Sequence, residues 1–251
     1  MLKLIINADD LGLTPGCSTG IVKALTEGIV SDTTLMINTE HAPQAIELVK
    51  ANGIKRVGLH LNLTYGQPVL PAASVPTLLD DSGRFRRRIA VSAPLLATEE
   101  VERELEAQVE KFLATGLELT HLDSHHHSHS YPQVLDIAIK LASQLKTPLR
   151  QTSPEVRDRI IAAGVKTTDW FTTDFYDQGV DLENLQMIIA GHDGGVLEIM
   201  CHPAREDELL FAVSSYNACR FKELAILTAP EIKRFLSEHG VKLISFAELT
   251  G

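Results

Sequence analysis

Cysteine is scarce in this chain of 251 residues, and the three that occur exclude two kinds of architecture. Cys17, Cys201 and Cys219 are widely spaced, odd in number and form no Cys-x-x-Cys pair. A disulfide framework needs paired cysteines, and a thiolate zinc site needs closely grouped ones. We therefore expect a protein of a reducing compartment, which favours a cytoplasmic location.

Long apolar runs and excess positive charge are missing as well. No segment approaches the roughly 20 apolar residues that span a bilayer, and the first run reaches Asp9 too soon for a secretory signal. With 23 basic and 33 acidic side chains the net charge is −10, which repels nucleic acid and anionic lipid. Neither a GxGxxG nor a Walker sequence occurs, which weakens a nucleotide-binding fold. A soluble protein with a small-molecule partner is predicted, without nucleic-acid or membrane partners.

The chain does contain a regular alternation of short apolar runs and longer amphipathic segments. Strands are predicted over 2–7, 31–38, 56–64, 118–122, near 149, 165–171, 196–201 and 241–245. Helices are predicted over 15–28, 43–51, 98–116, 132–145, 154–163, 182–190, 221–227 and 230–240. Seven or eight such β/α units predict a single (β/α) TIM-like barrel domain over residues 1–251, possibly irregular, with an open doubly wound sheet as the alternative.

The alternation lapses over residues 65–97, which contain several prolines and a basic cluster. This long insert is typical of a lid or binding loop, and Thr98 is predicted to cap the helix that follows. The cluster consists of Arg84, Arg86, Arg87 and Arg88. A solvated loop face is the favoured interpretation of these arginines, and contact with an anionic substrate group is the alternative.

Polar side chains gather where the predicted strands end. They are Asp9 and Asp10 after the first strand, His60 and Asn62 late in the third, Asp123 with a histidine group after the fourth, Asp174 and Asp177 after the sixth, and His202 after the seventh. In a parallel barrel these ends meet on one face, where catalytic sites are built. The distribution therefore predicts one pocket assembled from distant segments.

The first of these groups contains two adjacent carboxylates. Because adjacent residues at a strand end point to different sides, Asp9 and Asp10 are predicted to divide two tasks, one binding a metal and the other handling a proton. A turn or helix-cap role is the alternative for this pair. His60 taken alone is equally consistent with a hydrogen-bonded core histidine.

The strongest local signal is His121-Leu-Asp-Ser-His-His-His-Ser-His129, which holds five of the ten histidines. By alternation His121, Asp123 and His125 share one face, with Asp123 orienting an imidazole, and His125 is the first candidate for a metal ligand. The alternative is a loose surface tract that binds metals without catalysis.

His202 lies between Cys201 and Pro203 at the end of a buried strand. The histidine is predicted to be a proton donor, and Cys201 is interpreted as a core residue in preference to a nucleophile. Trp170 and Tyr176 could stack on a sugar ring, although single aromatic residues are usually core.

Four co-linear motifs resemble the YdjC-like carbohydrate deacetylases. They are Asn7-Ala-Asp-Asp-Leu-Gly12, Gly58-Leu-His-Leu-Asn-Leu-Thr64, His121-Leu-Asp-Ser-His-His-His127 and Met200-Cys-His-Pro203. The family has Phe where Leu11 stands here. The resemblance implies a (β/α) barrel variant that forms a homodimer. It also implies a divalent metal held by Asp10, His60 and His125. It names magnesium as that metal, and it implies hydrolysis of N-acetyl groups on N-acetylglucosamine-containing oligosaccharides such as chitooligosaccharides.

The hypothesis is therefore a metal-dependent deacetylase with Asp9 as base and His202 as acid. Asp123, His121, His127 and Asn62 are expected to support the ligands or contact the substrate. Two imidazoles would ordinarily favour Zn²⁺, Co²⁺ or Mn²⁺ over Mg²⁺. The alternatives are a metal-dependent sugar-phosphate phosphoesterase and a non-enzymatic metal- or sugar-binding protein.

Overall fold

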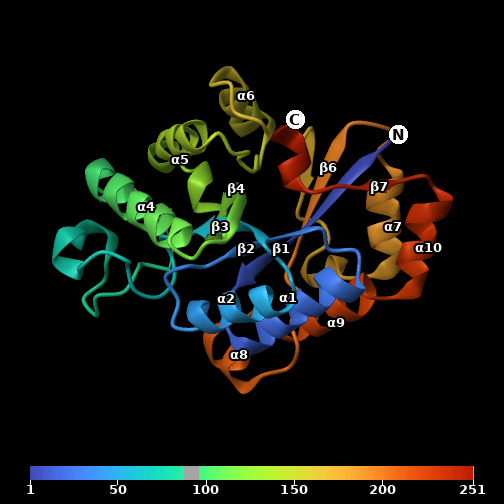
Figure 1. The fold of residues 1–251 in the computed structure, drawn as a ribbon, viewed down its shortest axis with the longest axis horizontal. Coiled ribbons are helices and arrows are strands. Elements are labelled where there is room, and N and C mark those ends of the chain that lie inside the picture. The colour runs from blue at the N-terminus through green and yellow to red at the C-terminus, as the bar shows by residue number, and fades with distance from the viewer. Residues whose placement is uncertain (88–95, 251) are drawn as a thin grey trace.

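Parallel strands form the centre of the molecule, and helices surround them (Figure 1). The computed structural model describes residues 1–87 and 96–250. The strands are β1 (Lys3–Leu11), β2 (Asp32–Leu35), β3 (Arg56–Leu61), β4 (Glu118–Ser124), β5 (Trp170–Thr172), β6 (Val196–Cys201) and β7 (Lys242–Leu243). The helices are α1 (Pro15–Glu27), α2 (Ala42–Ala51), α4 (Thr98–Leu113), α5 (Pro132–Leu145), α6 (Pro154–Ala162), α7 (Leu182–Ala190), α8 (Glu208–Val213), α9 (Ala218–Leu227) and α10 (Pro230–Glu238).

The sheet has the order β4-β3-β2-β1-β6-β5, and β7 pairs with the beginning of β1. A short extended segment lies between the edge strands β4 and β5. The amide of Arg150 donates to the carbonyl of Leu122 on β4 at 2.9 Å, and the amide of Leu149 donates to the carbonyl of Lys166 at 3.0 Å. The Leu122 amide also donates to the carbonyl of Pro148 at 2.9 Å, whereas Lys166 lies before β5. These few bonds link the edges only loosely, so the predicted (β/α) barrel is present in an irregular, incompletely closed form. The strand expected near Leu149 is reduced to one bridge with Leu122.

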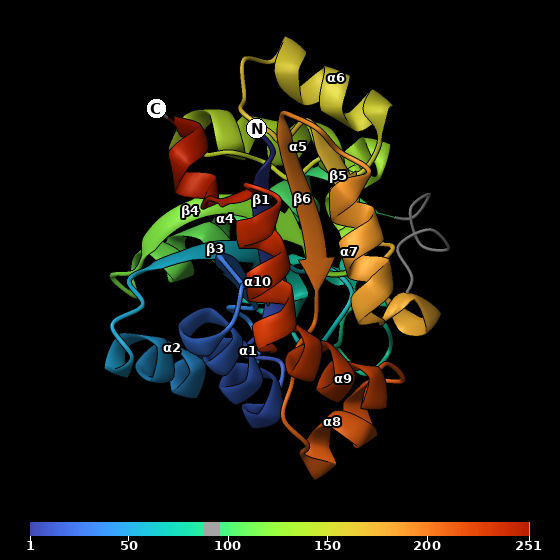
Figure 2. The ribbon, with the colours of Figure 1, turned by 90° about the vertical axis from the view of Figure 1, so that its right-hand side faces the viewer.

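The amino ends of the strands lie at the end of the molecule where both chain termini are found (Figure 2). There, Ile5, Ile244 and Phe246 form a separate apolar cluster. The buried carboxylate of Asp32 accepts hydrogen bonds from the amide of Phe246 and the hydroxyl of Ser245. The C-terminal segment thus closes the base of the sheet, and the opposite end carries the predicted pocket.

Helix boundaries follow the sequence signals to within about three residues, the largest differences being at the end of α4 and the start of α9. α5 and α7 have the predicted bounds, because Pro132 opens the first and the Asp181 side chain caps the second. Thr98 does not cap α4. It is the first helical residue, and Ala97 occupies the cap position without a side-chain bond. α8 was not predicted, since six residues are too few to show a helical period.

The predicted insert lies against α4. Glu104 on this helix accepts hydrogen bonds from the backbone amides of Val69 and Leu70, and Gln108 bonds to both backbone groups of Asn62. Residues 88–95, and with them Arg88, lie outside the described part of the chain. No helix over residues 1–87 or 96–250 is long and apolar enough to cross a membrane.

Candidate functional site

A pocket of about 470 Å³ lies at the carboxyl ends of the strands. Its volume falls in the range of small-molecule sites. The residues that line it include Asp9, Asp10, His60, Tyr65, Arg87, Ser124, His125, His126, His127, Thr173, Tyr176, Met200, His202, Ser214, Ser215, Tyr216 and Arg220. The expectation that distant segments meet in one pocket is therefore confirmed for most of the polar groups.

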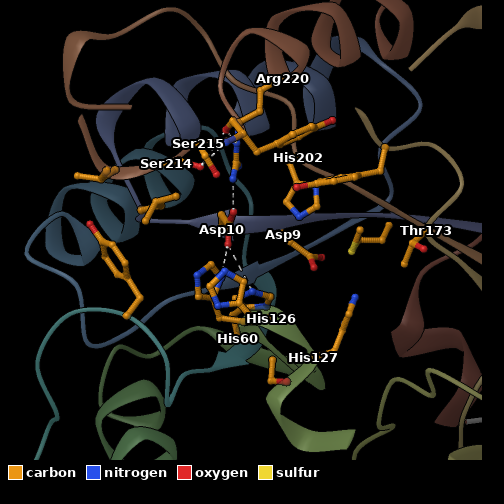
Figure 3. A pocket seen from close by; sticks show the side chains of 18 of the residues that line it. Asp9, Asp10, His60, His126, His127, Thr173, His202, Ser214, Ser215 and Arg220 are labelled. Atoms are coloured by element: carbon orange, nitrogen blue, oxygen red, sulfur yellow. Dashed lines mark hydrogen bonds and ion pairs between the residues drawn. The ribbon is translucent and has the colours of Figure 1, made fainter. Parts of the chain in front are cut away.

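The end of β1 turns its two aspartates in different directions. The pairing of β1 with β2 shifts register between Ala8 and Leu11, and Asp10 has a φ of 69°. Aspartate is among the few residues that tolerate this left-handed conformation. Asp9 and Asp10 consequently point in different directions, as Figure 3 shows, and contact different partners.

Asp9 forms a two-point ion pair with the buried guanidinium of Arg150. Nη1 and Nη2 lie 2.7 and 2.8 Å from the two carboxylate oxygens, and the side-chain amide of Asn7 donates to Oδ1 at 2.7 Å. Burial alone would raise the pKa of Asp9, but the charge and hydrogen bonds of Arg150 hold it well below its usual value. Asp9 is therefore ionised and rigidly held at neutral pH.

Arg150 also contacts two further acidic side chains inside the sheet. Its Nη1 lies 2.9 Å from Asp123 Oδ2, and its Nε donates to Glu198 Oε1 at 2.7 Å. Burial raises the pKa of Glu198 to about 8 in spite of this contact, so Glu198 is largely protonated at neutral pH. One fixed guanidinium thus contacts three buried acidic side chains, of which Asp9 is held ionised.

Asp10 lies between two imidazoles and a second arginine. Its Oδ1 is 3.0 Å from His125 Nδ1 and 3.4 Å from His60 Nε2, and its Oδ2 accepts from Arg220 Nη2 at 2.7 Å. Burial opposes ionisation, but Arg220 and His125 hold the pKa of Asp10 well below its usual value. In Figure 3 Asp10 stands between Arg220 on one side and the histidines on the other.

His60 is oriented by Asp123 from the neighbouring strand. The two residues are partners in the β3–β4 register, and His60 Nδ1 lies 2.8 Å from Asp123 Oδ1. This contact directs Nε2 toward Asp10, as carboxylates do behind metal-binding histidines. Burial lowers the pKa of His60, but Asp123 and Asp10 together raise it to about 10. With this pKa and no bound cation, the imidazole of His60 is protonated on both nitrogens and positively charged near pH 7.

Two groups of side chains have the spacing of a metal site. The donor atoms of Asp10, His60 and His125 lie within 4.8 Å of one another, and so do those of Asp9, His60 and Asp123. In the second group, the carboxylates of Asp9 and Asp123 both contact the Arg150 guanidinium already. In the first group Arg220 contacts only Oδ2 of Asp10, so Oδ1 faces the two imidazoles and no arginine.

His202 follows β6 and faces the same pocket. Its backbone amide donates to the carboxylate of Glu223, and its Nδ1 is buried without a hydrogen-bond partner in residues 1–87 and 96–250. Burial, reinforced by the charge of Arg220, lowers the pKa of His202 to about 3. The imidazole is therefore neutral near pH 7.

The remaining predicted residues divide into two sets. His127 lines the pocket beside Phe171, and burial lowers its pKa to about 4. His121 lies deeper in the barrel, where its ring stacks on Phe246 at 3.8 Å, so it does not line the pocket. Asn62 does not line it either. Its side chain bonds to Asn38 and to the backbone of Tyr65, and thereby holds the loop that brings Tyr65 to the pocket.

Some of the polar and aromatic residues predicted at strand ends lie outside the pocket. Asp174 and Asp177 are exposed, and Trp170 packs against His192 away from the pocket lining. The sequence reasoning missed Arg150 and Arg220, whose aspartate partners are 141 and 210 residues away. The only available signal was that Arg150 follows the short apolar run at Leu149.

Fold and site together define a class, that of parallel α/β barrel proteins with a buried histidine–carboxylate cluster at the carboxyl ends of the strands. The chain belongs to the YdjC-like protein family, whose model matches residues 3–238. It is 42% identical to a carbohydrate deacetylase from Brevibacillus brevis over 99% of this chain and all of that one. It is 40% identical, with the same coverage, to carbohydrate deacetylase 1 from Listeria innocua.

Two solved structures are similar to this chain. An Enterococcus faecalis V583 protein, described provisionally as a cellobiose-phosphate cleavage protein, has a TM-score of 0.93 and 34% identity over 98% of both chains. A family 4 carbohydrate esterase from Streptomyces lividans has a TM-score of 0.51 and 11% identity, over 96% of this chain and 91% of that one. The second similarity supports the fold alone.

Proposed function

We propose that this protein is a metal-dependent carbohydrate deacetylase, which releases acetate from N-acetylglucosamine-containing oligosaccharides of the chitooligosaccharide type. The observation that carries the proposal is the position of Asp10 Oδ1, within 3.4 Å of nitrogen atoms of both His60 and His125, with Asp9 ionised beside it in one pocket. The deacetylase names of relatives at 40–42% identity support the reaction type.

The residues present fit a divalent cation. Asp10, His60 and His125 would hold it, Arg220 would keep the second oxygen of Asp10, and Asp123 would keep His60 in the ligand orientation. A cation bound there supplies Lewis acidity, which lowers the pKa of water and polarises an acetyl carbonyl. The resemblance to the family favours Mg²⁺, whereas two imidazoles favour Zn²⁺, Co²⁺ or Mn²⁺.

Asp9 is the proposed general base. Arg150 and Asn7 fix its carboxylate and keep it ionised, so it can accept a proton from water in the pocket without moving. Such a base contributes roughly 10² to 10⁴ in rate. The ion pair with Arg150 also makes Asp9 a weak base. A cation held by Asp10, His60 and His125 would compensate for this, because it would lower the pKa of the attacking water.

His202 is the proposed proton donor to the departing amine, which leaves poorly unless it is protonated. Because burial keeps its imidazole neutral near pH 7, the proton that it transfers must reach it during turnover. His127 lines the same pocket and is proposed to contact the substrate, while His121 and Asn62 support the fold around the site.

The direct test measures acetate release from N,N′-diacetylchitobiose. We expect EDTA to abolish release and one of Mg²⁺, Mn²⁺, Co²⁺ or Zn²⁺ to restore it. Asp9→Asn should retain the metal and lose about 10² to 10⁴ in kcat, whereas His125→Ala should lose the metal.

His239→Ala is the matched control, because His239 is exposed on the last turn beyond α10 and lies outside the pocket. Full turnover after chelation would exclude the scheme, and metal loss in Asp9→Asn alone would exchange the roles of the two aspartates.

A second candidate is hydrolysis of a sugar phosphate at the same site. Arg87 lines the pocket, and the similar Enterococcus faecalis structure is named for a phosphorylated sugar. Release of phosphate without acetate from a phosphorylated N-acetylglucosamine disaccharide would favour this activity.

A cytoplasmic homodimer remains part of the proposal, and sedimentation equilibrium would test its oligomeric state.

A further inference from the structure

Two tyrosines from different loops stack against each other at the pocket. Tyr176 follows β5, and Tyr216 lies between α8 and α9. Their ring centroids are 3.9 Å apart and their planes differ by 18°. Both line the pocket, and Tyr176 is 40% exposed. Tyr176 is therefore not a core residue: Tyr216 covers one face of its ring, and the exposed part remains available to a ligand.

The pair is fixed before any ligand binds. The hydroxyl of Tyr216 donates to the buried carboxyl group of Glu223 and accepts from the backbone amide of Asp177 at 3.3 Å. The same Glu223 accepts the backbone amide of His202. Glu223 of α9 thus joins the end of β6 to the loop of Tyr216, and the Tyr216 hydroxyl extends this link to the loop of Tyr176. A ligand that stacks on this pair therefore loses little binding free energy to the ordering of these two side chains.

The pair also lies beside the proposed acid. The centroid of the His202 ring is 5.6 Å from that of Tyr176 and 5.6 Å from that of Tyr216, in edge-to-face arrangements. A pyranose ring presents a patch of C–H groups on one face, and these groups pack on an aromatic face while its polar substituents point sideways. A sugar seated on Tyr176 would carry its amine substituent next to His202.

We propose that Tyr176, backed by Tyr216 and tied by Glu223, is the stacking platform for the pyranose ring whose acetamido group is cleaved. The proposal rests on the deacetylase function inferred above and assigns the sugar-binding surface within that site. Trp170 is the other aromatic residue for which the sequence suggested stacking on a sugar. It packs against His192 at 5.3 Å and does not line the pocket, so it takes no part.

The test compares binding and turnover in the metal-loaded enzyme. Calorimetric titration with the glucosamine disaccharide gives a Kd without turnover, and acetate release from N,N′-diacetylchitobiose gives kcat and KM. We expect Tyr176→Leu to weaken Kd and raise KM by about tenfold, with a smaller change in kcat. Tyr176→Phe, which keeps the ring, should stay within about twofold of the unaltered enzyme. Trp170→Leu is the matched control and should change neither quantity.

The outcomes separate this proposal from the deacetylase function. Unchanged Kd and KM in Tyr176→Leu, with acetate still released, would overturn the platform and leave the function intact. Sugar binding that depends on Tyr176, without acetate release by the unaltered enzyme, would overturn the function and support the platform. Failure of the unaltered enzyme to bind either sugar would overturn the platform, as would equal losses in Tyr176→Leu and Trp170→Leu.

Discussion

Replacing Arg150 by methionine should destabilise the protein strongly, because its guanidinium is fully buried among three acidic side chains. Methionine fills much of the volume but leaves Asp9 and Asp123 without the cation that lies 2.7–2.9 Å from their oxygens. Breaking a buried ion pair by removing one partner costs about 3–5 kcal/mol. We expect a loss of that size in the free energy of unfolding at pH 7.

The pH dependence of this loss follows from Asp9. In the native protein its pKa lies below the ordinary value of 3.8, so its ionisation stabilises the fold above that pH, and this stabilisation disappears as the pH falls. In Arg150→Met the buried carboxyl group has lost its cation, so its pKa should rise above 3.8 and its ionisation should destabilise the fold. The difference between the two proteins should therefore grow as the pH rises through 3.8.

Urea unfolding followed by circular dichroism at pH 4 and pH 7 measures both effects. Arg159→Met is the matched control, since Arg159 pairs with Asp136 at the surface, where both side chains are at least 43% exposed. Such a pair contributes about 0–1 kcal/mol. A loss below about 1 kcal/mol in Arg150→Met, equal at both pH values, would refute the account of this buried cluster.

Two further predictions concern the inside of the barrel. Gly58→Ala should lower the free energy of unfolding by about 1–3 kcal/mol in urea titrations, because an added Cβ would lie 2.5 Å from His121 Cε1, and an unchanged midpoint would contradict this packing. Asp32→Asn should increase stability by up to about 3 kcal/mol at pH 8 and little at pH 4. Burial raises the pKa of Asp32 to about 6, so its ionisation destabilises the fold as the pH rises from 3.8 past 6, and equal effects at both pH values would argue against this titration.

The sequence predicted those features that leave a local pattern. Pro132 opens α5 where predicted, and the alternation of Leu59, His60 and Leu61 placed an imidazole inside the barrel. His121 shared that inward alternation, but it lies deeper, where it meets the C-terminal Phe246. Strand parity gives the face of a residue and not its depth, so the sequence could not separate His121 from Asp123.

The buried arginines could not be predicted for a different reason. Arg150 and Arg220 reach Asp9 and Asp10 across most of the chain, and a charge pair of such separation produces no period or motif. The left-handed conformation of Asp10, which turns its carboxylate away from Arg150, likewise depends on the register shift between β1 and β2. These details decide which aspartate accompanies the histidines.

The most direct measurement is an anomalous diffraction map of crystals grown with Mn²⁺. One peak bonded to Asp10, His60 and His125, at roughly 2.0–2.3 Å from each donor atom, is the predicted result. A peak held instead by Asp9 and Asp123, or density elsewhere on the molecule with none between the two imidazoles, would contradict the account.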